Sequence, residues 1–206
     1  NRRKQTLPAP LAVLSYRVVW YAREDGMKRI AVIYVSKYGA TARYAKWLAE
    51  ALDADLFENK RLSVQTAAPY EVIILAGGLF ATGIKGLSFL RDNMAALSGK
   101  RLYCLGVGAS PDEPEVLEEL RRGNAKGPLK DIPFFYARGA WDVQGMTPID
   151  RAMCTMLYKS LRKKDAEKLP AWARALIGAW HERCDWTDRA NLMPLIDRAL
   201  KDSQSE

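Results

Sequence analysis

Hydrophobic and polar positions along this chain alternate with two different periods from residue 29 onward. Ile30–Val35 is a nearly continuous apolar run, whereas residues 41–52 place Tyr44, Leu48 and Leu52 four positions apart. The run predicts a strand that is buried on both faces, and the spacing predicts an amphipathic helix after it. A buried strand followed by a helix is the repeating unit of parallel sheets.

The same alternation continues to about residue 141. Further strands are expected at ADLFEN, YEVIILA, RLYCLGVG and PFFYARGAW, which are residues 54–59, 70–76, 101–108 and 133–141. Helices are predicted at residues 83–97 and 114–122, with Pro114 in the first turn of the second helix. Five strands alternating with helices predict a three-layer α/β sandwich around a doubly wound, five-stranded parallel sheet.

The pattern changes after the fifth predicted strand. Helices are expected at residues 149–164 and 170–181, followed by a closing helix for which Thr187 is the predicted N-cap. Pro194 either kinks that closing helix or marks its first turn. Because a minimal five-stranded domain needs a single helix here, we interpret about residues 146–185 as a helical insertion.

One apolar stripe in the insertion has two interpretations. Ile149, Met153, Met156 and Leu157 share one face of the first inserted helix. Such a stripe either packs against the domain or contacts a partner such as an anionic membrane surface. The helix that carries Trp172 and Trp180 leaves the same two alternatives.

Residues 1–26 differ in character from the rest and do not enter the fold prediction. They contain Pro8 and Pro10 and are followed by Met27, where we expect the natural start. The segment is either a native extension or an appended remnant. The predicted domain therefore covers residues 27–206.

Composition and charge narrow the classes of partner. With 49% hydrophobic residues the chain is globular, and no apolar run approaches the roughly 20 residues that span a bilayer. The formal net charge is +8, and the excess is local, since residues 151–183 hold eight basic residues against three acidic ones. A local basic patch implies a lipid surface, a polycarboxylate substrate or a nucleic acid as neighbour. The absence of a nucleic-acid recognition motif argues against the last.

Cysteine and histidine are sparse. Cys104, Cys154 and Cys184 lie far apart, which fits a reducing, cytoplasmic compartment and inert thiols. His181 and Cys184 form an HxxC pair, but two ligands do not make a zinc site. No nucleophile elbow accompanies His181, so a Ser-His-Asp mechanism is not expected.

A turn of six small, hydroxylated and basic residues joins the first strand to its helix: Ser36, Lys37, Tyr38, Gly39, Ala40 and Thr41. A helix N-terminus presents unpaired N–H groups and a partial positive charge, which favour phosphate. Ser36 and Thr41 add hydroxyl donors, and Lys37 adds a charge. The turn lacks the Walker and GxGxxG patterns, so a single terminal phosphate fits better than a dinucleotide. The alternative is a plain turn with Thr41 as N-cap.

Two glycine-rich loops are predicted at the same edge of the sheet. GGLFATG, residues 77–83, follows the third strand, and GVGASPDEP, residues 106–114, lies at the end of the fourth. Glycines and one aromatic residue suit a planar ring that lies against backbone with Phe80 stacked on it, although Phe80 can also be a core side chain. Together with the phosphate-like turn, these loops predict flavin mononucleotide (FMN) as the ligand.

These features resemble the flavodoxin-like proteins over residues 28–202. The phosphate loop of that family has the form T/S-x-T-G-x-T, and SKYGAT matches it at Ser36, Gly39 and Thr41 but departs at Tyr38, where threonine is usual. Within the family the chain is most similar to the menaquinone-dependent protoporphyrinogen oxidase branch. That branch also tends to have a basic residue in the phosphate loop and a basic amphipathic helix after strand five.

The resemblance implies a flavodoxin-like sandwich with strand order 2-1-3-4-5 and FMN at the carboxyl edge of the sheet. The flavin supplies the chemistry, so no catalytic side chain and no metal is implied. The phosphate would lie on the first loop, and the ring between loops 78–83 and 108–111. The implied cofactor-binding residues are Ser36, Lys37, Tyr38, Gly39, Ala40, Thr41, Gly78, Leu79, Phe80, Ala81, Thr82, Gly83, Gly108, Ala109 and Ser110.

Three functions remain open. The first is an FMN-dependent oxidoreductase that oxidises protoporphyrinogen, a step of haem biosynthesis, and reduces a small-molecule partner such as a quinone. The second is an electron-transfer flavodoxin that docks on a redox protein, and the third is a flavodoxin-like module without flavin. Carriers are usually acidic, so the basic charge favours the enzyme. The basic residues within 146–183 would then contact a polycarboxylate substrate or the inner face of an anionic membrane.

Overall fold

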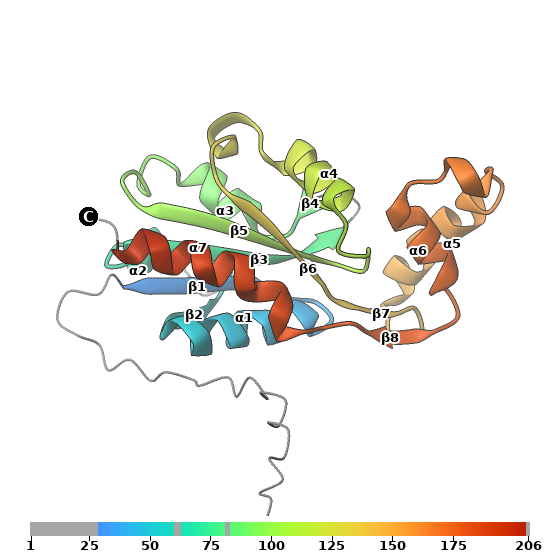
Figure 1. The fold of residues 1–206 in the computed structure, drawn as a ribbon, viewed down its shortest axis with the longest axis horizontal. Coiled ribbons are helices and arrows are strands. Elements are labelled where there is room, and N and C mark those ends of the chain that lie inside the picture. Colours follow the sequence, from blue (N-terminus) through green and yellow to red (C-terminus); the bar gives the residue numbers. More distant parts are fainter. Residues whose placement is uncertain (1–28, 60–62, 81–82, 205–206) are drawn as a thin grey trace, which may run out of the picture.

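Five parallel strands form the centre of the computed structural model, which describes residues 29–59, 63–80 and 83–204 (Figure 1). The strands are β1 (Ile30–Val35), β2 (Asp55–Glu58), β3 (Val72–Phe80), β5 (Arg101–Gly108) and β6 (Phe134–Arg138). Their order is β2-β1-β3-β5-β6, and each neighbouring pair is parallel. The predicted flavodoxin-like order is therefore confirmed, because the short strand β4 (Gly83–Ile84) only adds an antiparallel pair at the end of β3.

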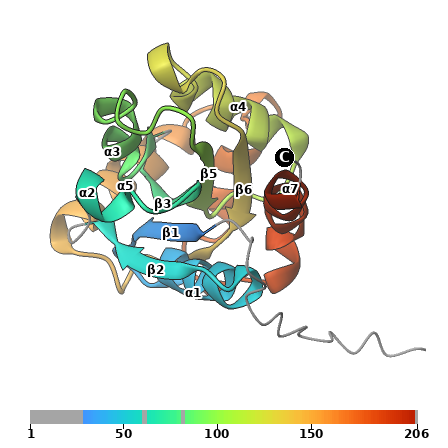
Figure 2. The ribbon, with the colours of Figure 1, turned by 90° about the vertical axis from the view of Figure 1, so that its left-hand side faces the viewer.

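Helices cover both faces of this sheet (Figure 2). One face carries α1 (Ala40–Leu52) and α7 (Met193–Gln204), and the other carries α2 (Val64–Ala67), α3 (Leu87–Asp92), α4 (Pro114–Asn124) and the 3₁₀ turn η2 (Gly127–Leu129). Val32 packs in the cluster that contains Leu48 of α1, whereas the next residue, Ile33, packs in the cluster that contains Leu90 of α3. Because successive side chains point to opposite faces, a strand covered on both sides needs a continuous apolar run.

After β6 the chain forms a lobe of residues 140–185 beside the carboxyl ends of the strands (Figure 1). Its stem is an antiparallel pair, β7 (Ala140–Asp142) and β8 (Arg183–Asp185), and between these strands lie α5 (Pro148–Leu161), η3 (Ala166–Lys168) and α6 (Ala171–Gly178). Leu161, Leu169 and Ala173 form the apolar centre of the lobe. The helical insertion that we predicted at about residues 146–185 falls within it. The chain returns to the sheet through η4 (Arg189–Leu192), which leads into α7.

The predicted helix at residues 83–97 is wrong at both ends. Its first residues form β4, where Ile84 pairs with Leu79. Gly86 has a φ of +86°, which a right-handed helix cannot contain, so α3 can start only after it. The helix then ends at Asp92, and the side-chain amide of Asn93 donates to the carbonyl of Phe89 at 2.8 Å, which supplies a partner for a carbonyl of the last turn.

Two predictions near the lobe also need correction. The predicted strand at 133–141 divides at Gly139, whose N–H donates to the carbonyl of Gly108 and whose carbonyl accepts from the N–H of Trp186. Thr187 is not the helix cap, because its hydroxyl bonds Asp185 at 2.7 Å, and Asp188 instead caps η4. Pro194 is the second residue of α7 and therefore marks its first turn rather than a kink.

The hydroxyl of Tyr44, a buried residue of α1, joins three parts of the chain. It donates to the carbonyl of Arg138 at 2.6 Å, and it accepts from the N–H of Asp188 at 3.0 Å and from the side-chain amide of Asn191 at 2.8 Å. Burial raises the pKa of this phenol, which keeps the donor protonated. One side chain thus fixes where the chain leaves the sheet for the lobe and where it comes back.

Tyr44→Phe is expected to lower the free energy of unfolding by about 1–3 kcal/mol, because it removes all three hydrogen bonds and leaves partly buried partner groups unpaired. Urea unfolding followed by circular dichroism measures this loss. Tyr34→Phe is the matched control, since Tyr34 is half-buried on β1 and its hydroxyl has no hydrogen bond within the described residues. Equal losses in the two variants would contradict the role assigned to the Tyr44 hydroxyl.

Candidate functional site

The turn between β1 and α1 leaves the N-terminus of α1 open. α1 begins at Ala40, its N-cap is Gly39 with a φ of +98°, and no side chain caps its first turn, which also contains no acidic residue. The N–H of Gly39 donates to the hydroxyl oxygen of Ser36 at 3.2 Å, which holds the turn in shape. The alternative with Thr41 as N-cap is wrong, because Thr41 is the second helical residue. We refer to residues 36–41 as the phosphate loop, since its amides and positive helix end suit an anion.

The structure brings the three predicted loops together at the carboxyl edge of the sheet. A Cβ atom on Gly78 would lie 3.4 Å from the hydroxyl oxygen of Thr41, so β3 ends beside the phosphate loop. A Cβ atom on Gly139 would lie 3.4 Å from both the Cβ of Ala40 and the carbonyl oxygen of Gly108, so the end of β5 lies there as well. These close approaches account for the small residues in all three segments.

The end of β3 presents an aromatic ring near two lysines. Phe80 is half-buried at the end of β3, outside the two core clusters of the sheet. The ammonium nitrogens of Lys85 and Lys37 lie 4.9 Å and 5.8 Å from the centroid of its ring. A partly exposed aromatic face with adjacent positive charge suits a planar anionic ligand. Ala81 and Thr82, also predicted for the site, lie outside the described residues.

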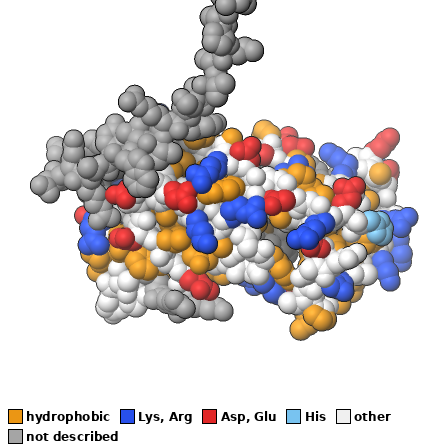
Figure 3. Space-filling view, turned by 90° about the horizontal axis from the view of Figure 1, so that it is seen from below, with side chains coloured by type: hydrophobic (Ala, Val, Ile, Leu, Met, Phe, Trp, Pro, Cys, Tyr) orange, Lys and Arg blue, Asp and Glu red, His pale blue; other side chains and the backbone are white. Residues whose placement is uncertain are grey.

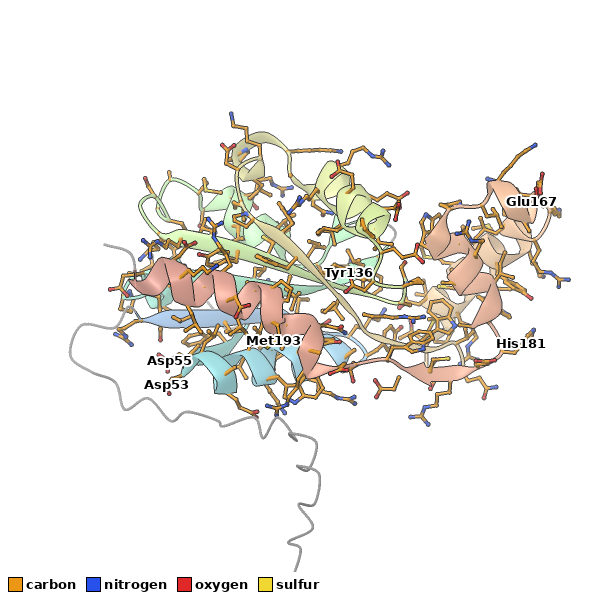
Figure 4. All side chains as sticks on the ribbon, viewed as in Figure 1. Asp53, Asp55, Tyr136, Glu167, His181 and Met193 are labelled. Carbon is orange, nitrogen blue, oxygen red and sulfur yellow. The ribbon has the colours of Figure 1, made fainter. Side chains whose placement is uncertain are left out.

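Two side chains of β6 hold the loop after β5 in place. The hydroxyl of Tyr136 donates to the carbonyl of Ser110 at 2.7 Å, and the guanidinium of Arg138 donates to the carbonyl of Ala109 at 3.4 Å. Burial raises the pKa of the Tyr136 phenol well above its usual range, so it remains a donor. Figure 4 marks Tyr136 within the domain on β6. The backbone of Gly108, Ala109 and Ser110 is therefore positioned before any ligand binds.

Asp150 of α5 lies on the phosphate loop. Its carboxylate accepts from the ammonium group of Lys37 at 2.5 Å and from the hydroxyl of Tyr38, and the N–H of Thr147 donates to that same hydroxyl at 3.3 Å. The hydrogen bond from Lys37, followed by that from Tyr38, lowers the pKa of Asp150, and the bond to Asp150 raises the pKa of Lys37. The lobe is thus tied to the loop through two of the predicted site residues.

Sequence reasoning did not identify Asp150 as a site residue. It lies 113 positions from Lys37, and its own surroundings in the sequence are those of an ordinary first-turn acid that follows the N-cap Thr147. The departure at Tyr38 was the available signal, because a tyrosine in this position reaches further than a threonine. Its hydroxyl is engaged with the lobe.

Arg43 provides a second link between α1 and the lobe. Its guanidinium donates to the carboxylate of Asp185 at 2.6 Å and to the hydroxyl of Thr187 at 2.7 Å. The hydrogen bond from Arg43 and then that from Thr187 lower the pKa of Asp185. Both ends of the lobe are therefore held against the segment that carries the phosphate loop.

The described part of the chain contains neither a group of metal ligands nor a helix that could cross a membrane. No group of three or more His, Cys, Asp or Glu side chains there has the arrangement of a metal site. His181 lies on the lobe, as Figure 4 marks it, with Tyr158 as an aromatic neighbour. Within the same described residues, no helix combines the length and the apolar character that crossing a bilayer requires.

Comparison with solved structures gives matches that share little sequence with this chain. The Trp repressor binding protein from Bacillus subtilis is 16% identical, with a TM-score of 0.42 over 54% of this chain and 85% of that one. A flavodoxin from the domain Archaea is 14% identical, with a TM-score of 0.36 over 62% and 92% of the two chains. A flavoprotein in complex with FMN from Lactobacillus acidophilus NCFM is 12% identical, with a TM-score of 0.37 over 54% and 92%.

Comparison with curated proteins found no match. A scan against family models matches the flavodoxin domain over residues 31–168. The matched segment begins in β1 and runs through the phosphate loop, both glycine-rich loops and α5. It therefore contains all the residues predicted to bind the cofactor. With two thirds of its length in this match, and with the strand order expected for the fold, the chain belongs to the flavodoxin domain family.

Proposed function

We propose that this flavodoxin-domain protein binds FMN at the carboxyl edge of its sheet and acts as an FMN-dependent oxidoreductase. The observation that carries the proposal is the uncapped N-terminus of α1, which meets two glycine-rich loops at one place. An uncapped helix end without acidic residues is suited to a dianionic phosphate. Membership of the flavodoxin domain family supports the same cofactor.

The residues present fit this cofactor. The hydroxyls of Ser36 and Thr41 and the amides of the first turn of α1 would hold the ribityl phosphate, with Lys37 supplying charge. The ring would lie between the loop that carries Phe80 and the backbone at residues 108–110. When bound, FMN supplies the transfer of electrons or hydride, and the chain supplies position and electrostatics.

We further propose that the substrate carries carboxylates, as protoporphyrinogen does, and that a quinone accepts the electrons. Lys85 places positive charge beside Phe80, where Lys37 is paired with Asp150, and the lobe next to this edge contains the basic excess of residues 151–183. Such surroundings favour an anionic substrate. They suit an acidic carrier surface poorly, so a role as a pure electron carrier is the second candidate.

The purified protein is expected to be yellow, and Thr41→Ala combined with Lys37→Glu is expected to weaken FMN binding about tenfold or more. The double variant removes one hydroxyl donor and replaces an attractive charge with a repulsive one. Titration of the apoprotein with FMN, followed by flavin fluorescence, measures the dissociation constant.

The matched control for that experiment is Lys46→Glu, which makes the same charge change on an exposed position of α1 outside the phosphate loop. Unchanged affinity in the double variant would mean that the phosphate lies elsewhere. A colourless protein that does not take up added FMN would support a flavodoxin-like module without flavin.

Asp150→Asn is expected to tighten FMN binding by about two- to fivefold at low salt. The carboxylate of Asp150 neutralises Lys37 and would face the phosphate, so its replacement by an amide of similar shape frees positive charge for the ligand. The same FMN titration at low and high salt measures the effect, which should shrink as salt screens the charges. Weaker binding in this variant would show instead that Asp150 holds the loop in its binding conformation.

Anaerobic mixing of the FMN-loaded protein with protoporphyrinogen and a menaquinone analogue is expected to give turnover, measured as porphyrin fluorescence. Lys85→Glu should lower the rate at subsaturating substrate, because it reverses a charge beside Phe80. Lys46→Glu serves again as the control. A flavin that is reduced only by other redox proteins, with no reaction toward porphyrinogen or quinone, would support the electron carrier.

A further inference from the structure

The outer face of α5 exposes large apolar side chains. Ile149, Met153, Met156 and Leu157 are 74%, 62%, 70% and 39% exposed. Seven large hydrophobic side chains are exposed among the described residues, and these four lie on one helix. A contiguous apolar stripe on a protein surface indicates an interaction site, whereas single exposed apolar side chains do not. Packing of this stripe against the domain, one of the two interpretations of the sequence, is therefore wrong.

The lobe buries the side of α5 that carries Tyr158, together with the last residue of the helix, Leu161. Leu161 packs in the apolar centre of the lobe with Leu169 and Ala173. The ring of Tyr158 stacks on that of Trp180, with centroids 4.2 Å apart and an interplanar angle of 7°. These contacts form the apolar centre of the lobe. The exposed stripe of α5 takes no part in them.

The aromatic residues of the lobe are used inside it. Trp180 also contacts Trp141 of β7, with centroids 6.2 Å apart, and Trp172 packs against the cluster of Leu161. Both tryptophans that the sequence left open for a surface role are thus engaged in packing. Among the described residues of the lobe, the large exposed apolar side chains are those of α5.

Basic side chains accompany the stripe. Met156 shares an open groove of about 760 Å³ along α5 with Arg151, Lys159 and Lys163, and Lys164 follows at the end of the helix. Figure 3 shows blue side chains beside the pale-blue histidine of the lobe, as well as across the rest of this face. Within residues 148–164 the sequence has five basic residues and one acidic one, Asp150, which Lys37 neutralises. The exposed surface of α5 is therefore cationic and apolar at once.

We propose that α5 lies on an anionic lipid surface. Ile149, Met153, Met156 and Leu157 would enter the boundary between headgroups and acyl chains, and Lys159, Lys163 and Lys164 would contact lipid phosphates. An amphipathic helix with this distribution of charge has the character of an interfacial segment. Charge complementarity indicates lipid as the partner, because the lysines beside the stripe need a negatively charged surface to bind.

Other occupants fit the charge less well. A second copy would bring the same cations face to face, since a symmetric contact pairs a patch with itself. Residues 1–26 of this chain hold five basic residues against two acidic ones, so they are repelled too. An acidic protein remains as the alternative that the experiment must separate from lipid.

The bond between Asp150 and Lys37 connects the exposed surface of α5 to the phosphate loop. Asp150 and Ile149 are neighbours in the first turn of α5, so a lipid-bound α5 holds the phosphate loop next to the membrane. If the proposed function is correct, the carboxyl edge would face a quinone dissolved in the bilayer. The docking itself does not depend on bound flavin, and the two proposals can fail separately.

Sedimentation of the full-length protein with vesicles tests the docking. We expect binding to vesicles of phosphatidylcholine mixed with phosphatidylglycerol, little binding to phosphatidylcholine alone, and release by high salt. Met153→Ser with Met156→Ser, and separately Lys159→Glu with Lys163→Glu, should each reduce the partition constant about tenfold or more. All four positions are exposed, so circular dichroism and thermal melting of both variants should match the wild type.

Matched controls separate α5 from the rest of the surface. Met193→Ser replaces an exposed methionine on α7, and Lys46→Glu with Lys201→Glu makes the same charge change on α1 and α7. Both controls should bind vesicles as the wild type does. Hydrogen exchange should show new protection of the amides of residues 148–164 when anionic vesicles are added.

Three results would overturn the proposal. The first is equal loss of vesicle binding in the α5 variants and the controls. The second is vesicle binding without protection of residues 148–164, which would assign the affinity to another segment. The third is absence of vesicle binding, whether the protein stays monomeric, self-associates in light scattering or binds an acidic protein through α5.

Discussion

An uncapped helix N-terminus at the end of β1 is the constraint on which the rest of this structure depends. The phosphate loop leaves the first amides of α1 without a side-chain partner, and unpaired amides are costly unless water or a ligand meets them. This position is possible because β1 is buried on both faces and α1 packs its apolar side against the sheet, which together hold the turn in place. Gly78 of β3 and Gly139 after β6 then let two further backbone segments approach it.

The lobe modifies this edge in a way that the bare fold does not require. Asp150 binds two residues of the phosphate loop, and Arg43 of α1 binds Asp185 at the end of the stem. Asp150 and Lys37 thus place opposite charges together at the phosphate loop. We interpret the balance as a link between the loop and α5, since the same helix turn carries Asp150 and the start of the exposed stripe.

Several expectations were corrected for reasons of backbone conformation rather than hydrophobicity. The apolar pattern of residues 83–97 suits a helix, yet the left-handed Gly86 divides a strand from α3. Gly139 likewise moves the chain from the main sheet to the stem through its two backbone hydrogen bonds. Periodicity reports which faces are buried, but it does not report where φ becomes positive or where a strand changes its partner.

The sequence by itself determined the strands of the sheet and the three loops at its carboxyl edge, because continuous apolar runs and glycine-rich turns are local properties. The strand order came from the resemblance to the flavodoxin-like proteins. It also predicted the phosphate loop, whose six residues are consecutive. Only the tertiary structure decided that Asp150 meets Lys37 and Tyr38, since that contact joins residues more than 100 positions apart. It also decided that Met153 and Met156 face outward. Amphipathic spacing alone does not say whether the apolar side of a helix finds a partner within its own chain.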